Sequence, residues 1–272
     1  MTLTKAYQHV YLSPHYDDIS LSCGGTIHKQ IQAGQSVLVI TICAAPPPAH
    51  DPLSPFAQSL HQKWGGLEDV VAARRAEDEV AMVILEVDSV RLNITDCIYR
   101  GRVQDKMWYY NNDAELFGQI HADDATLSHD IAEAILGTVT QDTNTTLYAP
   151  LTVGHHVDHQ LVHAAALRLQ NLGWEVAFYE DYPYVDPGYR PHGQANPYDL
   201  EATIAHLQQA NLKPQVQFFS ENNLQAKIES IAAYASQLQM LFGGRVNLET
   251  QVRNYALSVG EGSPAERVWL PG

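Results

Sequence analysis

The sequence predicts an α/β fold: a three-layer α/β/α sandwich around a mostly parallel, Rossmann-like sheet. Strand-like and helix-like patterns alternate along the chain, which is typical of parallel strands joined by crossover helices. The run at 36–43, Ser-Val-Leu-Val-Ile-Thr-Ile-Cys, is apolar and β-branched, as in a strand buried on both faces. The 272 residues contain no repeat, linker or low-complexity segment, so we expect one domain covering 1–272.

Each predicted element follows from its local pattern. A buried strand at 8–12 is bounded by a proline, and a helix at 25–33 ends at Gly34, a usual position for the glycine that ends a helix. Apolar periodicity predicts further helices at 67–85, 127–141, 158–171, 198–210, 222–241 and 249–257. Further strands are expected at 89–94, 145–150, 175–180 and 215–219. The segments 44–66, 95–126 and 181–197 lack periodicity, so we expect long loops that shape a pocket.

Composition limits the possible partners. The chain has 31 acidic and 16 basic residues, a formal net charge of −15 and no lysine- or arginine-rich run, so nucleic acid is excluded as a partner. No stretch is apolar enough to span a membrane, and no signal-type segment precedes the first strand. The three cysteines lack CxxC spacing, which indicates neither a disulfide framework nor a thiolate zinc site and fits a cytoplasmic protein.

The densest group of polar side chains lies at the end of the first predicted strand. Ser13-Pro14-His15-Tyr16-Asp17-Asp18 places one imidazole and two carboxylates within four residues, between a strand and a helix. In open α/β sheets, ligands bind at the carboxyl ends of the strands. This segment is therefore a candidate metal site.

A second group, Gly154-His155-His156-Val157-Asp158-His159, also follows a strand and precedes a helix. We expect it at the same edge of the sheet as the first group. His15, Asp18 and His159 could then offer nitrogen and oxygen ligands with one coordination position left open, as a catalytic zinc requires. Two imidazoles and a carboxylate also accept Fe²⁺ or Co²⁺, so the metal stays open between these ions.

The remaining polar residues of the two groups have other predicted roles. Asp17 could act as a general base on water, and His156, with Asp158 beside it, is suited to hold a proton. Gly24-Gly25 lacks the surrounding pattern of a nucleotide-binding loop. The histidines outside the two groups are interpreted as ordinary polar or core residues. They are His28, His61, His121, His129, His163, His192 and His206.

With these residues the chain resembles the PIG-L/LmbE family of zinc-dependent N-deacetylases. The family's His-Pro-Asp-Asp segment corresponds to 15–18, and its His-x-Asp-His segment corresponds to 156–159. Three further segments are similar to family motifs. Cys23-Gly24-Gly25-Thr26 is similar to the family's glycine turn, and Arg74-Arg75-Ala76-Glu77 is similar to its Arg-x-x-Glu helix. Lys227 followed by Tyr234-Ala235-Ser236-Gln237 is similar to its C-terminal helix motif.

The resemblance implies an LmbE-like fold and removal of an acetyl group from N-acetylglucosamine-type sugars or related amides. The implied roles are zinc ligation by His15, Asp18 and His159, general base for Asp17, acid or oxyanion stabiliser for His156 beside Asp158, and substrate contact for Arg74.

Two positions depart from the family pattern. Tyr16 replaces the usual proline, which should change the stiffness of the loop rather than metal ligation. Gly154 stands where some members place a tyrosine that polarises the substrate carbonyl. Zinc, His156 or a loop tyrosine would then take this task, and the candidate tyrosines are Tyr109, Tyr182 and Tyr184.

The predicted reaction is metal-assisted amide hydrolysis, with Asp17 taking a proton from water and His156 stabilising the oxyanion. The predicted partner is a small N-acetylated sugar or amine, and a homo-oligomer stays open. Two alternatives are a hydrolase for another acylated amine at the same zinc site, and a non-catalytic sugar-binding protein. The second alternative predicts ligand affinity that does not depend on Asp17.

Overall fold

A computed structural model describes residues 5–47, 51–66, 69–142, 144–189, 199–207 and 211–272. The main sheet contains β1 (His9–Ser13), β2 (Val37–Thr41), β3 (Asp88–Arg91), β6 (Thr146–Pro150), β7 (Glu175–Tyr179), β8 (Leu212–Phe218) and β9 (Ala265–Pro271). A two-stranded ribbon pairs β4 (Gly101–Arg102) with β5 (Met107–Trp108). The helices are α1 (Asp18–Gln32), α2 (Pro55–Lys63), α3 (Val70–Ile84), α4 (Asp113–Leu116), α5 (Leu127–Thr138), α6 (Val157–Asn171), α7 (Leu200–His206), α8 (Glu221–Ala232), α9 (Ala235–Phe242) and α10 (Arg245–Val259).

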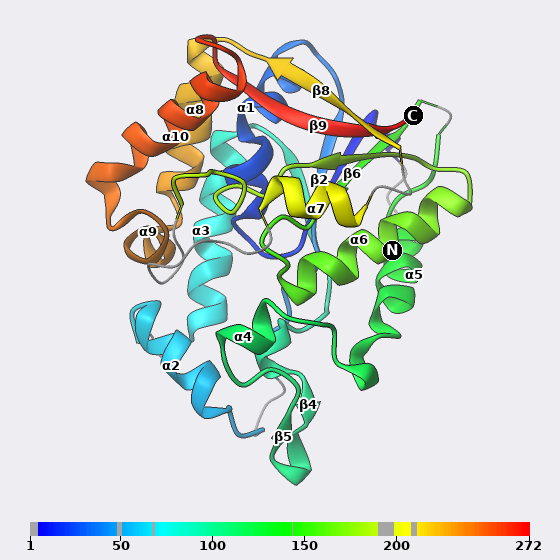
Figure 1. Ribbon diagram of the computed structural model, residues 1–272, viewed down its shortest axis with the longest axis vertical. Coiled ribbons are helices and arrows are strands. Elements are labelled where there is room, and N and C mark those ends of the chain that lie inside the picture. Colours follow the sequence, from blue (N-terminus) through cyan, green and yellow to red (C-terminus); the bar gives the residue numbers. More distant parts are fainter. Residues whose placement is uncertain (1–4, 48–50, 67–68, 143, 190–198, 208–210) are drawn as a thin grey trace.

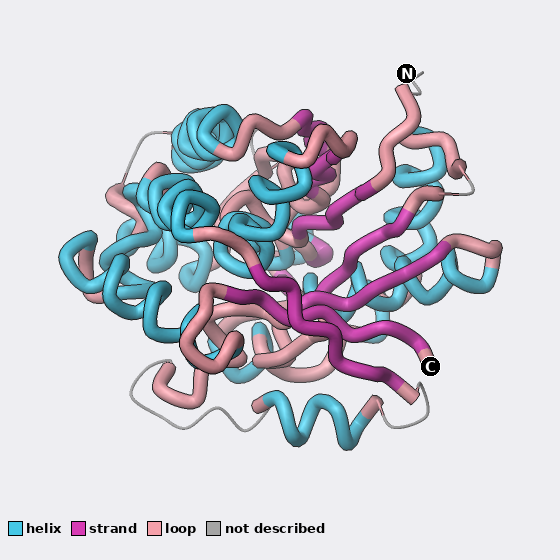
Figure 2. Tube along the Cα trace, turned by 90° about the horizontal axis from the view of Figure 1, so that it is seen from above, coloured by secondary structure: helices cyan, strands magenta, loops and turns pink. Residues whose placement is uncertain are grey.

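The sheet has the order β3-β2-β1-β6-β7-β9-β8. The first five strands are parallel, whereas β9 runs antiparallel to both β7 and β8. Figure 1 shows α1, α3 and α8 on one side of the sheet and α5 and α6 on the other, and Figure 2 shows the strands side by side from above. The predicted three-layer, mostly parallel α/β/α fold is therefore confirmed. Strands from both ends of the described chain share this sheet, which supports the prediction of one domain.

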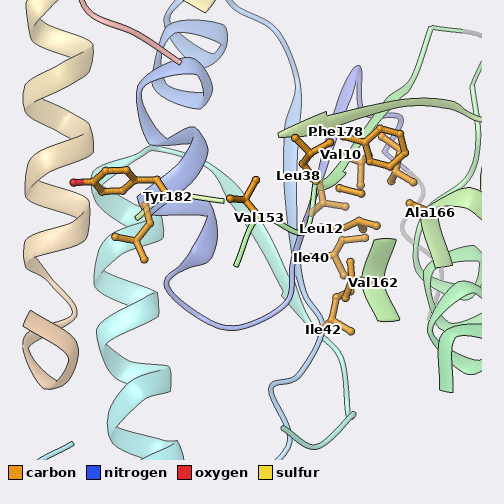
Figure 3. Close-up of a cluster of buried hydrophobic side chains, with 14 of the residues drawn as sticks. Val10, Leu12, Leu38, Ile40, Ile42, Val153, Val162, Ala166, Phe178 and Tyr182 are labelled. Atoms are coloured by element: carbon orange, nitrogen blue, oxygen red, sulfur yellow. The ribbon is translucent and has the colours of Figure 1, made fainter. Parts of the chain in front are cut away.

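Alternating side chains in the central strands form a core on each face of the sheet. Val10 and Leu12 of β1 pack in a cluster with Val162 and Ala166 of α6 (Figure 3). Tyr11, between them in the sequence, packs in a second cluster with residues of α1 and α3. Because both faces are covered by helices, these strands are mostly apolar, as the sequence pattern predicted.

The first helix is longer than predicted. It begins at Asp18 rather than near Gly25, so Cys23-Gly24-Gly25-Thr26 lies inside a helix and forms no turn. The Glu266 carboxylate of β9 accepts hydrogen bonds from the amides of Gly25 and Thr26, at 3.0 and 2.9 Å. A Cβ atom at Gly25 would lie 2.5 Å from the Phe219 ring. The glycine serves close packing here, while the predicted helix end at Gly34, with φ +77°, is confirmed.

The predicted helix at 222–241 is two helices, α8 and α9, separated near Tyr234. The Tyr234 hydroxyl donates to Asp78 of α3 at 2.9 Å, and the Ser236 amide and hydroxyl donate to Glu77 at 2.8 and 2.6 Å. These contacts to α3 fix the start of the new helix. The Arg-x-x-Glu segment and the C-terminal motif recognised in the sequence are therefore packed against each other.

Other boundaries also differ from the predictions. The segment 44–66 is not wholly a loop, since it contains α2, which begins with Pro55 and is capped by the Ser54 hydroxyl. The segment 95–126 contains the β4–β5 ribbon and α4. The helix predicted at 249–257 extends over α10, and β9 was missed. Parts of four predicted elements, at 48–50, 67–68, 190–198 and 208–210, lie outside the described residues.

Candidate active site

The two predicted groups of polar residues meet at one edge of the sheet. β1 and β6 are parallel neighbours, and the chain leaves β1 toward β2 on one side and returns to β6 on the other. This is the topological switch point at which open α/β sheets form their ligand crevice. His15, Asp17 and Asp18 follow β1, and the segment 156–159 follows β6.

The Asp18 carboxylate lies near both His15 and His159. Asp18 Oδ2 is 3.2 Å from His15 Nδ1 and 3.4 Å from His159 Nε2. The residues are 9%, 8% and 2% exposed. Two ligands of a tetrahedral zinc ion, each about 2.0–2.1 Å from the metal, are about 3.3 Å apart, so each of the two spacings to Asp18 fits such an ion. Among the described residues, the sets of three whose donor atoms all lie within 4.8 Å of one another do not include this triad. The His15 amide also donates to Asp18 Oδ2 at 2.7 Å, which fixes the carboxylate.

The rings of the three histidines also converge. Ligand atoms of His15, His156 and His159 lie within 4.8 Å of one another, so a set of three imidazoles is a second possible metal cage. Two further groups of the same spacing share its members, Cys97 with His156 and Asp158, and His15 with Asp96 and Asp158. Both His15 and His159 belong to the predicted set and to the three-histidine set.

The outer nitrogen of each predicted histidine ligand faces a carboxylate. His15 Nε2 is 3.0 Å from Asp158 Oδ2, and His159 Nδ1 is 2.6 Å from Asp181 Oδ1. Burial lowers the pKa of His159, but Asp18 and Asp181 outweigh it and raise the pKa to about 9. Carboxylates in this position fix the ring orientation of metal-binding histidines.

Asp17 precedes the first turn of α1, and its carboxylate makes no capping hydrogen bond. Instead Asp17 Oδ1 accepts from Arg74 Nη2 of α3 at 3.2 Å. The Arg74 guanidinium lies 4.7 Å from the Trp64 ring and 5.7 Å from the Tyr16 ring, so the two aromatic residues hold it in place. Burial raises the pKa of Asp17, the Arg74 cation lowers it and Asp18 raises it, and the net change is upward. A carboxylate with a raised pKa is a stronger base.

His156 is the residue before α6, and its Nδ1 accepts the amide hydrogen of Asp158 at 3.2 Å. Burial, followed by the neighbouring His15, lowers the pKa of His156 well below its usual range. The Asp158 carboxylate hydrogen-bonds with other groups: His15, the Cys97 amide at 3.1 Å and Arg100 at 2.5 Å. The expected pairing of the Asp158 carboxylate with His156 is therefore replaced by a pairing with His15.

Sequence reasoning missed three residues of this site. Asp181 follows β7 and Asp96 follows β3, so the rule that linked His15 to His159, a polar residue after a parallel strand, applies to both. Asp96 Oδ2 lies 3.7 Å from His15 Nε2. Arg100 joins Asp158 to Asp124, which accepts from its Nε at 2.9 Å. No local pattern marks Arg100, because its role depends on the path of the segment 95–126.

A cavity of about 1010 Å³ opens over these residues. All three predicted pocket segments contribute to its wall, through Leu60 and Trp64, Ile98 and Phe117, and the stretch 182–189. This part of the prediction is confirmed for the described residues. The wall at the C-terminal side, which the sequence did not indicate, comes from α9 and α10 and includes Gln237, Gln239, Met240, Leu241, Gln251 and Asn254.

The structure separates the three candidate tyrosines. Gly154 has φ +88°, and a Cβ atom there would lie 2.6 Å from the Tyr184 ring, so Tyr184 occupies the space that a side chain at position 154 would fill. The Tyr184 ring is 6.2 Å from that of His159 and lines the cavity. Tyr109 stacks on His121 at 4.3 Å and lines a different cavity. Tyr182 also lines the main cavity, but its ring packs against Tyr255.

No helix within the described ranges is long and apolar enough to cross a membrane.

Comparisons with known proteins point to one family. Residues 10–170 match the family model described as PIG-L, GlcNAc-PI de-N-acetylase. The 2'-N-acetylparomamine deacetylase of Niallia circulans is 31% identical over 186 residues, 64% of this chain and 66%, just under two thirds, of that protein. The protein of the same name from Streptomyces fradiae is 28% identical over 229 residues, 83% of this chain and 72% of that protein.

Solved structures agree over nearly the whole chain. The zinc-inhibited form of teicoplanin deacetylase has a TM-score of 0.74 at 25% identity and covers 96% of both chains. The deacetylase of the A40926 pseudoaglycone has a TM-score of 0.70 at 26% identity, over 98% of this chain and 97% of that one. The predicted fold and the predicted class of enzyme, an N-deacetylase, are confirmed. The matched family model covers more than half of the sequence, and the chain belongs to the PIG-L family of de-N-acetylases.

Proposed function

We propose that this chain is a metal-dependent hydrolase that removes the N-acetyl group from an N-acetylglucosamine-type sugar within a small glycoconjugate. The observation that carries the proposal is the convergence of His15, Asp18 and His159 at the sheet's switch point, with the base candidate Asp17 beside them and a cavity above. Two relatives and several structural neighbours are named as deacetylases, which supports the same reaction.

His15, Asp18 and His159 are the proposed ligands of a divalent cation. The three residues are buried, each spacing between Asp18 and a histidine fits a tetrahedral ion, and each histidine has a carboxylate on its outer nitrogen. The cation would supply Lewis acidity to the acyl group and to the attacking water. Zinc is the proposed ion because two imidazoles and a carboxylate with an open position match its catalytic sites, and Fe²⁺ or Co²⁺ are alternatives because they accept the same ligands.

The side chains around this site have separate proposed tasks. Asp17 takes a proton from the attacking water, and Arg74, held between two aromatic rings, keeps the Asp17 carboxylate oriented. Arg74 also lines the cavity, so its guanidinium is the proposed substrate contact. His156, with its lowered pKa, donates a hydrogen bond to the oxyanion from Nε2, while Nδ1 is held by the backbone. The Tyr184 hydroxyl is the proposed replacement for the absent tyrosine at position 154.

The substrate is proposed to carry more than one ring. A volume of about 1010 Å³ exceeds what one sugar requires. The distant wall is lined by carboxamides, including Gln239, Gln251 and Asn254, which suit hydroxyl and amino groups. Two relatives are named for 2'-N-acetylparomamine, so this compound is the first substrate to test.

The other finer predictions remain proposals. A cytoplasmic location is supported by three buried free cysteines. An alternative function is hydrolysis of another acylated amine at the same metal site. This alternative predicts metal uptake and a catalytic requirement for Asp17, but other preferred substrates.

The test measures metal content and acetate release for wild type, Asp17→Asn and the control Asp130→Asn on the surface of α5. Substrates are 2'-N-acetylparomamine and simple N-acetylglucosamine derivatives. We expect about one metal per chain in all three proteins and a loss of turnover of about 10²-fold or more only in Asp17→Asn. Acetate release by Asp17→Asn at the wild-type rate, or a wild type that takes up no divalent metal on reconstitution, would refute the proposal.

A further inference from the structure

His159 lies between two carboxylates that contact opposite nitrogens of its ring. Nδ1 is 2.6 Å from Asp181 Oδ1, and Nε2 is 3.4 Å from Asp18 Oδ2. The side chains of His159 and Asp181 are 3% and 1% exposed, so water has little access to this contact. The sequence patterns do not point to Asp181, and the proposed function uses its contact with His159 without assigning it an effect on metal affinity.

The position of Asp181 is fixed from both sides. Its second oxygen, Oδ2, accepts the amide hydrogen of Val153 at 3.0 Å. Asp181 follows β7 and Val153 follows β6, two paired strands, so the backbone that holds the carboxylate belongs to the rigid sheet edge. No lysine or arginine of the described segments forms an ion pair with Asp181, so its charge acts on His159.

An ionised carboxylate only accepts hydrogen bonds, so a neutral His159 facing Asp181 must carry its proton on Nδ1. Nε2 then presents its lone pair toward Asp18 and the proposed metal position. We infer that Asp181 is a positioning residue that fixes the tautomer and the direction of His159 and thereby sets the metal affinity of the site. This inference rests on the proposed metal site.

His15 shows the same arrangement with the ring nitrogens exchanged. Its Nε2 faces Asp158 at 3.0 Å, and its Nδ1 faces Asp18 at 3.2 Å. However, Asp158 also binds Arg100, so a substitution there would leave a buried guanidinium without its partner. Asp181 is therefore the carboxylate at which the effect on the metal can be measured alone.

Asp181→Asn is the informative variant because an amide cannot satisfy both neighbours. If its oxygen accepts from His159, its NH₂ group faces the Val153 amide, which is also a donor. If its oxygen accepts from Val153, its NH₂ group donates to Nδ1, and the ring proton moves to Nε2, where it blocks metal binding. Asp186→Asn is the matched control, since Asp186 lies in the same loop and its carboxylate accepts the Gly188 amide rather than facing a histidine.

The experiment measures the dissociation constant of Zn²⁺ by competition with a chromophoric chelator. We expect affinity about 10–100-fold weaker in Asp181→Asn and unchanged affinity in Asp186→Asn. Nitrogen-15 NMR of the zinc-loaded, histidine-labelled wild type gives a second readout that needs no variant. It should show His159 with a proton on Nδ1 and the metal on Nε2.

The outcomes separate this inference from the proposed function. Wild-type zinc affinity in a folded Asp181→Asn protein, or NMR evidence for metal on Nδ1 of His159, would overturn the inference and leave the hydrolase proposal standing. A wild type that binds no divalent metal would overturn both. A variant that weakens zinc binding while Asp186→Asn does not would support the inference, whatever substrate the enzyme uses.

Discussion

Gly25→Ala tests whether close packing, rather than a turn, requires glycine inside α1. The added Cβ would lie 2.5 Å from Cζ and 2.7 Å from Cε1 of the Phe219 ring. Ordinary carbon contacts are about 3.5 Å or longer, so the ring must move by about 1 Å. Phe219 is itself 8% exposed and part of the core, which leaves little room for such a shift.

The expected size of the effect follows from two opposing terms. Overpacking in a core costs about 1–3 kcal/mol. Replacing glycine by alanine inside a helix gains up to about 1 kcal/mol. We therefore expect Gly25→Ala to lower the free energy of unfolding by about 1–2 kcal/mol. The control is Gly137→Ala in α5, where a Cβ would meet nothing within 4 Å, so only the helix-propensity gain should appear.

The assay is urea unfolding of the metal-free proteins followed by circular dichroism, with unchanged slopes required for comparison. Phe219→Leu in the Gly25→Ala background should recover part of the loss, because the smaller side chain makes room for the new methyl group. A Gly25→Ala protein as stable as Gly137→Ala would refute the packing argument.

Three further predictions concern the remaining buried charges. Lys227→Met should lower the free energy of unfolding by about 3–5 kcal/mol, because Glu266, which lies 2.7 Å from the Lys227 ammonium group, would be buried without its cation. A loss of less than about 1 kcal/mol in urea unfolding would contradict this prediction. Burial raises the pKa of Asp78 to about 6, so the stability due to its protonated form is present below about pH 4 and is lost as the pH rises through about 6, by about 3 kcal/mol in all. Urea unfolding across this pH range should show the loss of stability in wild type but not in Asp78→Asn. Free energies of unfolding that change with pH in the same way in both proteins would contradict the prediction. Arg74→Lys should lower kcat/KM at least about tenfold with metal content unchanged, because an ammonium group cannot keep both the ring contacts and the hydrogen bond to Asp17. Steady-state rates equal to wild type would disprove the role of Arg74 in orienting Asp17.

The central part of the site was predictable because its residues are adjacent in the sequence to strand ends. His15 and His159 each follow a buried apolar run, and parallel strands bring such positions to one edge of the sheet. The fold class was predictable for the same reason, since alternation of strands and helices depends on local pattern.

Other features depend on contacts that no local pattern records. The break between α8 and α9 comes from hydrogen bonds to Glu77 and Asp78 of α3. The two glycines inside α1 are explained by distant neighbours, since Phe219 packs against Gly25 and Lys227 packs against Gly24. Asp181 could have been found by applying the strand-end rule to every strand, whereas the role of Arg100 could not.

The position of β9 affects the order in which the protein can mature during synthesis. All of the proposed metal ligands and Asp181 lie N-terminal to Glu266, which hydrogen-bonds α1 from the inserted strand β9. At ordinary elongation rates, the roughly 85 residues between Asp181 and Glu266 take about 4–17 s to make. A nascent chain therefore has every metal-binding side chain for several seconds before the strand that secures the first helix exists. Metal captured in that interval would be held by an incompletely packed protein, so we expect productive loading to follow chain release.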